Sequence, residues 1–241
     1  MGVVAIIPAR MASTRLPNKP LLKETGKYLI QHVVERVRQA RGLDRIIVAT
    51  DDRRILDACA EFGAEAVLTR ADHPSGTDRI AEVAAGLTEE FILNVQGDEP
   101  EMPTGHIEAV VRALRESGAP MSTAAVPMSE EEVDNPNRVK VILRADGRAI
   151  YFSRSRIPFN RDGGPLPAGL GYLLHLGIYG YRRDFLMRYP SLPACPLEQA
   201  EKLEQLRVLY HGYDIAVAVV SGHFSGIDTP RDYAAFVQRT K

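Results

Sequence analysis

Over the first 117 residues, short runs of apolar and β-branched residues alternate with longer segments whose apolar positions follow a helical spacing. The short runs predict strands, and the longer segments predict helices that bury one face. The expected strands cover residues 3–7, 45–50, 66–69 and 91–95, and the expected helices cover residues 29–40, 53–62, 77–87 and 104–117. Such alternation with nearly continuous apolar strands is typical of a parallel sheet covered by helices on both faces.

The alternation of strands and helices becomes less regular after about residue 120. Strands are expected at residues 121–127, 138–144, 147–153, 175–183 and 215–220, and helices at residues 197–210 and 230–240. Asp146-Gly147 is a hairpin signal between two of these strands, and Pro230 suits the first turn of the closing helix. Residues 154–171 are rich in Pro, Gly and charge and predict a long loop.

The expected helix at 197–210 has one apolar and one polar side. Its inward residues would be Leu197, Leu203, Leu206 and Leu209. Its polar side would hold Glu201, Glu204 and Gln205, either facing solvent or contacting a hydroxyl-rich ligand. The part after about residue 145 is interpreted as an elaboration between sheet strands, because the run at 215–220 is expected to rejoin the main sheet.

Composition narrows the function classes. The 241 residues carry a formal net charge of −1 and no block of like charges, which disfavours nucleic acid as a partner. No apolar run reaches the length of a membrane helix and no signal peptide is recognisable, so we expect a cytoplasmic protein without a membrane anchor. Cys59 and Cys195 lie far apart and predict neither a disulfide nor a zinc site; Cys59 is expected in the core.

A cluster of cations follows the first strand. Residues 1–23 hold Arg10, Arg15, Lys19 and Lys23 and no acid before Glu24. Arginine forks and a lysine charge beside hydroxyls suit the oxygens of a triphosphate. The alternative is a solvated loop whose arginines pair with acids elsewhere. Neither GxxxxGK[ST] nor GxGxxG occurs, which disfavours ordinary P-loop NTPases and most Rossmann dehydrogenases.

Two carboxylates are candidate magnesium ligands. Asp98 comes just after a buried strand, where a carboxylate can hold Mg²⁺ against substrate phosphates, and Asp228 is its natural partner if the last strand lies near the fourth. Asp98 could instead be a turn residue before Pro100, and Asp228 could cap the closing helix. Thr77 has the same ambiguity as Asp228. The six histidines lack metal-binding spacing, and His175 is expected to pack or to make one hydrogen bond.

Seven segments, in order and across nearly the whole chain, resemble the 3-deoxy-manno-octulosonate cytidylyltransferase family: IPARMASTRLPNKPL, HPSGTDR, NVQGDEP, YFSRSRIPF, HLGIYGYR, LEQLRVL and GIDTP. The resemblance implies a Rossmann-like nucleotidyltransferase fold, with a mostly parallel mixed sheet and helices on both faces. It implies one domain over residues 1–241, with an inserted sugar-binding and dimerisation subdomain at about 148–212. It further implies a homodimer that uses Mg²⁺ to make CMP-Kdo and pyrophosphate from CTP and 3-deoxy-D-manno-octulosonate (Kdo), for lipopolysaccharide biosynthesis.

The resemblance also implies roles for residues at matching positions. The nucleotide would be held by Pro8, Ala9, Arg10, Ser13, Arg15, Lys19, Ser75, Gly76 and Arg79, of which the last three would lie near the cytosine. Asp98 and Asp228 would bind Mg²⁺ and, with Lys19, form the catalytic set. The sugar acid would contact Gln96, Arg154, His175, Tyr179, Glu204 and Gln205.

The chain departs from the family pattern in three places. Asn18 stands where a glycine is usual, and since Asn tolerates the left-handed conformation, the loop can still turn. The segment GKYL at 26–29 replaces a proline-containing form, and the loop at 161–171 is shortened. Two rival functions are compatible with the sequence: a cytidylyltransferase for another sugar acid, and a catalytically idle nucleotide-binding module.

Overall fold

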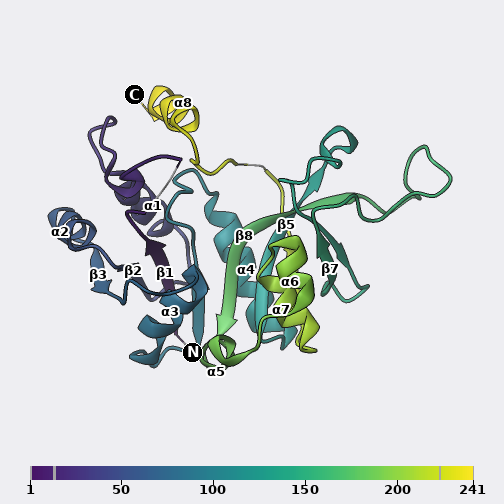
Figure 1. Ribbon diagram of the computed structural model, residues 1–241, viewed down its shortest axis with the longest axis horizontal. Coiled ribbons are helices and arrows are strands. Elements are labelled where there is room, and N and C mark those ends of the chain that lie inside the picture. Colours follow the sequence, from purple (N-terminus) through teal and green to yellow (C-terminus); the bar gives the residue numbers. More distant parts are fainter. Residues whose placement is uncertain (1, 13–14, 223, 241) are drawn as a thin grey trace. The chain divides into compact units, whose positions relative to one another are not determined.

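The computed structural model describes residues 2–12, 15–222 and 224–240, and the chain forms two compact units (Figure 1). Unit 1 comprises Met1–Glu108, Arg182–Pro190 and Phe224–Lys241, and unit 2 comprises Ala109–Tyr181 and Ser191–His223. The inserted sugar-binding and dimerisation subdomain expected at 148–212 stays a prediction. Among the described residues, no helix combines the length and the apolar character needed to cross a membrane.

Unit 1 is built on a parallel sheet. Its strands are β1 (Val3–Ala9), β2 (Arg45–Thr50), β3 (Glu65–Leu68) and β4 (Phe91–Asn94), in the order β3-β2-β1-β4. Figure 1 shows β3, β2 and β1 side by side. Residues Val3–Ile7 of β1 are at most 1% exposed, because this strand is covered on both sides. Because β1 and β4 are parallel, their carboxyl ends lie at the same sheet edge. The basic loop, which carries Arg10 and Arg15, begins there after Ala9, and a second loop begins there after Asn94.

The helices of unit 1 follow its strands in the chain. They are α1 (Leu29–Val37), α2 (Arg53–Glu61), α3 (Gly76–Ala85), α5 (Arg183–Arg188) and α8 (Pro230–Thr240), with a 3₁₀ turn η1 at Lys19–Leu21. The bounds of β2 and α8 agree with the sequence prediction at every residue, and Cys59 is fully buried as expected. Helix α5 was not predicted, because the sequence pattern indicates a strand up to residue 183 and no element directly after it.

Unit 2 carries a mixed sheet. Strand β5 (Met121–Met128) pairs antiparallel with β8 (Tyr172–Arg182) and parallel with β9 (Ile215–Val219), which confirms that the run at 215–220 returns to a sheet. Strands β6 (Lys140–Leu143) and β7 (Ala149–Ser153) form the expected hairpin, with Gly147 at φ +81°. Helix α4 (Thr104–Ser117) matches its predicted range and contributes to both units. Strand β6 also pairs antiparallel with β8. Four of these seven strand pairs are parallel, so the chain has the expected mostly parallel α/β fold.

The single helix expected at 197–210 is wrong. The segment forms two short helices, α6 (Pro196–Glu201) and α7 (Gln205–Tyr210), because Lys202 adopts the left-handed conformation at φ 53° and ends the first of them. Leu197, in α6, is 39% exposed rather than inward. The break changes the direction of the side chains that follow it, and Gln205, expected on the polar side, is 3% exposed.

Candidate functional site

Lys19 lies at the centre of a polar cluster in unit 1. Asn18, at φ 56° and ψ 23°, turns the basic loop into η1 and confirms that asparagine serves where a left-handed residue is needed. The turn directs the Lys19 side chain inward, where it is 13% exposed. Its Nζ donates to Asp98 Oδ2 at 2.6 Å, to the Ile227 carbonyl oxygen at 2.8 Å and to Asp228 Oδ1 at 3.4 Å.

Asp98 is held close to β1 by a tight backbone approach. A Cβ atom at Gly97 would lie 2.8 Å from the Pro8 carbonyl oxygen, so this position needs glycine to keep the turn against the strand. The Asp98 carbonyl oxygen accepts a 2.9 Å hydrogen bond from the Ile227 backbone N–H. This bond joins the turn after β4 to the segment before α8 and sets the spacing of the two candidate carboxylates.

Asp228 does not cap α8. Thr229 and Asp232 cap the helix instead, since Asp232 Oδ2 accepts from the Thr229 N–H at 2.8 Å, and Thr229 Oγ1 accepts from the Asp232 N–H at 3.2 Å. The Asp228 carboxylate faces Lys19 and Arg15, whose Nη2 lies 3.1 Å from Asp228 Oδ1. The capping alternative for Asp228 is therefore wrong, and the alternative that an arginine of the basic loop pairs with an acid elsewhere holds for Arg15.

An apolar cluster supports this arrangement from behind. It contains Leu16, Leu29, Ile227, Tyr233 and Phe236, which come from the basic loop, α1, the segment before α8, and α8 itself. Burying these side chains packs residues 16–29 against residues 227–236, two stretches that are far apart in sequence. The positions of Lys19 and Asp228 follow from that packing.

Glu99 has an unusual environment. Its Oε2 atom is buried and, within the described part of the chain, has no hydrogen-bond partner. Burial, reinforced by the neighbouring Asp98 and Asp228 carboxylates, raises the pKa of Glu99 from 4.5 to about 8, although Lys19 opposes the shift. Glu99 therefore carries a proton near pH 7 and adds little negative charge to the cluster.

The cluster suits a magnesium ion whose coordination is completed by phosphate oxygens of the substrate. No group of three or more His, Cys, Asp or Glu side chains suited to a metal occurs in the described residues. Asp98 and Asp228, however, already converge on one cation, the Lys19 ammonium. Magnesium in nucleotide sites is commonly held by one or two carboxylates together with phosphate oxygens and water, which matches this pair.

The start of α3 lies beside the end of β1. Ser75 caps the helix, since its Oγ accepts from the Asp78 N–H at 3.2 Å, so Thr77 is not the cap. A Cβ atom added to Gly76 would lie 3.7 Å from Pro8 Cγ, so Gly76 and Pro8, both expected at the nucleotide, are brought together. The contact is between the Gly76 backbone and the Pro8 ring.

Arg79 has partners within the protein. Its guanidinium is 5% exposed, and it donates to Thr69 Oγ1 at 2.5 Å and to Asp51 Oδ2 at 2.7 Å. Arg79 thereby fixes α3 against the loop after β2. Arg10 is exposed, and the Ser13 position lies outside the described residues.

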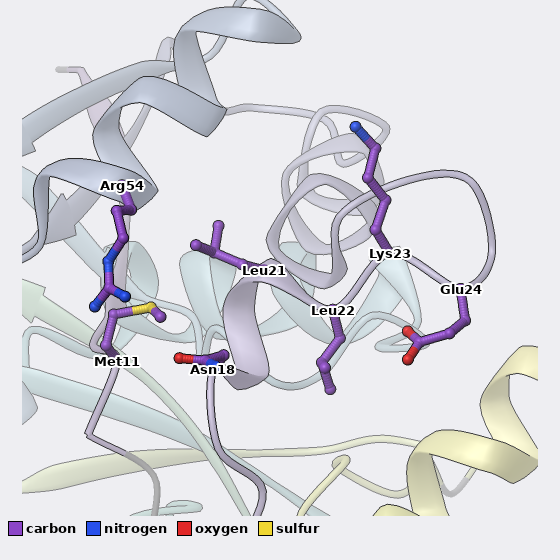
Figure 2. Close-up of a pocket in the computed structure, with 7 residues that line it drawn as sticks. All are labelled: Met11, Asn18, Leu21, Leu22, Lys23, Glu24 and Arg54. Carbon is purple, nitrogen blue, oxygen red and sulfur yellow. The ribbon is translucent and has the colours of Figure 1, made fainter.

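A cavity of about 570 Å³ borders the basic loop (Figure 2). It is lined by Met11, Asn18, Leu21, Leu22, Lys23, Glu24 and Arg54. Both basic side chains of its lining have acidic partners: Arg54 pairs with Asp52 at 2.6 Å, and Lys23 Nζ lies 3.8 Å from Glu61 Oε2. None of the residues expected to bind nucleotide or sugar lines this cavity.

In unit 2, His175 lies among aromatic side chains. The His175 and Phe152 ring centroids are 4.9 Å apart, and those of His175 and Tyr179 are 5.5 Å apart. The His175 Nε2 atom is 3.0 Å from Thr123 Oγ1. Burial lowers the pKa of His175 from 6.5 to about 3, so the ring is neutral at physiological pH.

Tyr179, which packs against His175, also contacts Gln205. The Tyr179 hydroxyl donates to Gln205 Oε1 at 3.3 Å. The Gln205 Nε2 atom is buried and has no hydrogen-bond partner in the described residues, so this amide has a donor to offer. Glu204, next to it in the chain, is exposed. The break at Lys202 is what turns Gln205 inward.

Arg154 is anchored by carbonyl oxygens of its own unit. Its guanidinium donates to the carbonyls of Glu201 at 2.6 Å, Pro136 at 2.9 Å and Lys202 at 3.4 Å. The Glu201 carboxylate accepts from Ser153 Oγ at 2.6 Å and from the Arg154 N–H at 2.9 Å. Arg154 and Glu201 together hold the break between α6 and α7.

Gln96 lies in unit 1, whereas the other five residues expected at the sugar acid lie in unit 2. Glu99 and Glu201 were not expected as part of either set. The sequence did place Glu99 beside Asp98, but nothing in the pattern indicated that its carboxyl would be buried. Glu201 was assigned to a polar helix face, and its contacts with Ser153 and Arg154 depend on a strand 48 positions away.

The chain is similar to known proteins over nearly its whole length. The chain matches the family described as cytidylyltransferase over residues 4–215. A protein of Syntrophotalea carbinolica named 3-deoxy-manno-octulosonate cytidylyltransferase is 48% identical over 239 residues, which cover 96% of each chain. A protein of the same name from Syntrophobacter fumaroxidans is 52% identical over 244 residues, which cover 98% of this chain and 96% of that relative.

A solved structure has the same fold as this chain. It is described as CMP:2-keto-3-deoxy-manno-octonic acid synthetase complexed with CTP. It superposes with a TM-score of 0.94 at 41% sequence identity and covers 99% of this chain and 98% of its own.

Proposed function

Because the chain belongs to the 3-deoxy-manno-octulosonate cytidylyltransferase family, we propose that it transfers CMP from CTP to Kdo and releases pyrophosphate, with Mg²⁺ as the metal. The observation that supports this most directly is the convergence of Asp98 and Asp228 on Lys19 beside the basic loop. An idle nucleotide-binding module would be expected to lose part of that set, and it is complete here. The product would supply activated sugar for lipopolysaccharide biosynthesis.

The reaction needs no protein nucleophile. The oxygen of the anomeric hydroxyl of Kdo attacks the α-phosphorus of CTP, the bond from that phosphorus to the bridging oxygen breaks, and pyrophosphate leaves while the hydroxyl proton is released. Arg10, Arg15 and Lys19 would hold the phosphate oxygens in line and offset their charge. Asp98 and Asp228 would hold Mg²⁺, which when bound supplies charge neutralisation and lowers the pKa of the attacking hydroxyl.

The base and the sugar acid would meet different parts of the chain. Pro8, Ala9 and the capped start of α3 at Ser75 and Gly76 would contact the cytosine, with Arg79 holding that helix in place. In unit 2, the neutral His175 and the free amide donor of Gln205 suit the hydroxyl groups of a sugar. Arg154 would meet the Kdo carboxylate with the guanidinium N–H groups that its carbonyl partners leave available. Gln96, Tyr179 and Glu204 complete the proposed contacts.

We also propose a homodimer formed through the segment at about 148–212, and a cytoplasmic location. The exposed apolar side chains Ile150, Leu197 and Tyr210 lie in that segment and suit a partner surface. Analytical ultracentrifugation tests the assembly, since a monomer at micromolar concentration would contradict it.

The function is tested by pyrophosphate release, with each of four NTPs offered against a panel of 2-keto sugar acids and Mg²⁺ present. We expect turnover with CTP and Kdo. Turnover with another sugar acid alone would assign that substrate instead, and activity only with UTP and a sugar 1-phosphate would contradict the proposal.

The metal assignment is tested by Asp98→Asn. This change should lower kcat/KM about a thousandfold, because it removes a ligand whose charge the transition state needs. Asp72→Asn is the matched control, since Asp72 is an exposed carboxylate that pairs only with its neighbour Arg70 among the contacts described, and it should keep the wild-type rate. Near wild-type turnover by folded Asp98→Asn would remove Asp98 from the metal site.

A further inference from the structure

The Lys19 ammonium is placed as a metal ion would be. It contacts both candidate metal ligands, at 2.6 Å from Asp98 Oδ2 and 3.4 Å from Asp228 Oδ1, and completes its coordination with the Ile227 carbonyl at 2.8 Å. We propose that Lys19 is an internal substitute for the metal. In the nucleotide-free protein it neutralises the two carboxylates, and it leaves them for the triphosphate when metal and nucleotide bind together. This inference rests on the proposed function of the same site.

The exposure of these side chains supports an exchange of Lys19 for a metal ion. Lys19 is 13% exposed and reaches the carboxylates from the protein side, whereas the Asp98 and Asp228 side chains are 31% and 48% exposed. Solvent ions can therefore reach the carboxylates while the ammonium lies behind them. Lysine carries a compact charge on a flexible four-carbon stem, so its Nζ can change partners without a change in the backbone.

The carboxylates cannot simply move apart to relieve a loss of Lys19. The 2.9 Å hydrogen bond from the Ile227 N–H to the Asp98 carbonyl ties their two chain segments together. Ile227 is 2% exposed and packs in the apolar cluster with Leu16 and Tyr233. The pair is thus a preformed cation site, and Lys19 is the cation that fills it.

The charge balance explains how the position of Lys19 affects metal binding. Lys19 and Arg15 together offset the charges of Asp98 and Asp228, so a divalent cation that arrives alone meets a neutralised site and a repelling ammonium. A triphosphate offers Lys19 and Arg15 new anionic partners and frees the carboxylates. Metal and nucleotide should therefore bind with positive coupling, each raising the affinity for the other.

The experiment measures Mn²⁺ binding to the nucleotide-free protein by electron paramagnetic resonance, with Mg²⁺ as competitor. Lys19→Met should bind Mn²⁺ at least about tenfold more tightly than wild type, since even in water one positive charge about 4 Å from a divalent ion repels it substantially. Lys19→Arg should stay as weak as wild type. Lys27→Met is the control, because Lys27 is an exposed lysine of the same unit that pairs with Glu35. Equal or weaker Mn²⁺ binding by Lys19→Met would overturn the proposal.

Two further variants keep the test decisive. Lys19→Gln serves if Lys19→Met does not fold, and the same gain is expected of it. Adding Asp98→Asn to either variant should abolish the gain; if the gain persists, the ion binds elsewhere and the proposal fails. Saturating CTP should raise the Mn²⁺ affinity of wild type, after correction for the Mn²⁺–CTP complex in solution. This increase should be smaller in Lys19→Met. Wild-type pyrophosphate release tests the proposed function separately, so an active enzyme whose Lys19 variants show no gain would disprove only this inference.

Discussion

Replacing His175 with glutamine should remove a large part of the acid sensitivity of the fold. In the folded protein, burial lowers the pKa of His175 from 6.5 to about 3, and the ring packs against Phe152 and Tyr179 beside Thr123. The unfolded chain exposes the ring to water and protonates it at the ordinary pKa. Below pH 6.5 the unfolded state therefore binds more protons than the folded state, and stability falls as the pH falls from 6.5 towards 3.

The magnitude follows from those two pKa values. At pH 5 the unfolded ring is almost fully protonated and the folded ring is not. Because pH 5 lies about 1.5 pH units below the unfolded pKa of 6.5, the free energy of unfolding is about 2 kcal/mol lower at pH 5 than at pH 8. This result depends little on the folded pKa, as long as that value stays well below 5. Glutamine keeps a polar group near Thr123 but cannot titrate, so its variant should lose about 2 kcal/mol less than wild type between pH 8 and pH 5.

The assay is urea unfolding of both proteins at pH 8 and pH 5, followed by circular dichroism. Tyr179→Phe is the control, because it alters the neighbouring ring without removing the imidazole and should keep the wild-type pH dependence. A difference between wild type and His175→Gln below about 0.5 kcal/mol would refute the reasoning, since it would mean that the folded ring titrates as it does in water.

Two further outcomes are expected. Gly97→Ala should destabilise the protein by about 1–3 kcal/mol and lower kcat/KM, because its Cβ would lie 2.8 Å from the Pro8 carbonyl; Gly105→Ala, with no atom within 4 Å, should lose no stability by thermal unfolding. Equal stability of Gly97→Ala and wild type would show that the loop is free to move away. Glu201→Gln should raise KM for the sugar acid about 5- to 20-fold, because it weakens the bonds to Ser153 and Arg154, and should leave KM for CTP within about twofold. Steady-state kinetics would contradict this if both KM values rose together.

Elements with a strong local signal were predicted accurately. The bounds of β2, α4 and α8 follow from periodicity, and Pro230 begins α8 as its fixed φ angle favours. The left-handed turn at Asn18 was also predictable, because few residues other than glycine tolerate that conformation. In each case the information lies within a few residues of the feature.

The helix expected at 197–210 shows where local information fails. The leucine spacing continues across Lys202, yet that residue is left-handed and the chain starts a second helix at Gln205. The Arg154 contacts to the carbonyls of Glu201 and Lys202 stabilise the break. A side chain that follows a distant strand thus overrides helical periodicity, and only the folded chain shows it.

Residue order was enough to predict the α/β class, most element positions and the residue types of a nucleotide site, because hydrophobic periodicity and turn chemistry are local. Which groups meet depends on the folded chain. Lys19 contacts carboxylates 79 and 209 positions further along, Thr229 caps α8 and so leaves Asp228 available, and the Glu99 carboxyl is buried enough to hold a proton. The physical reason is that these properties depend on distance and desolvation between segments, which packing of the apolar core fixes and which residue order does not state.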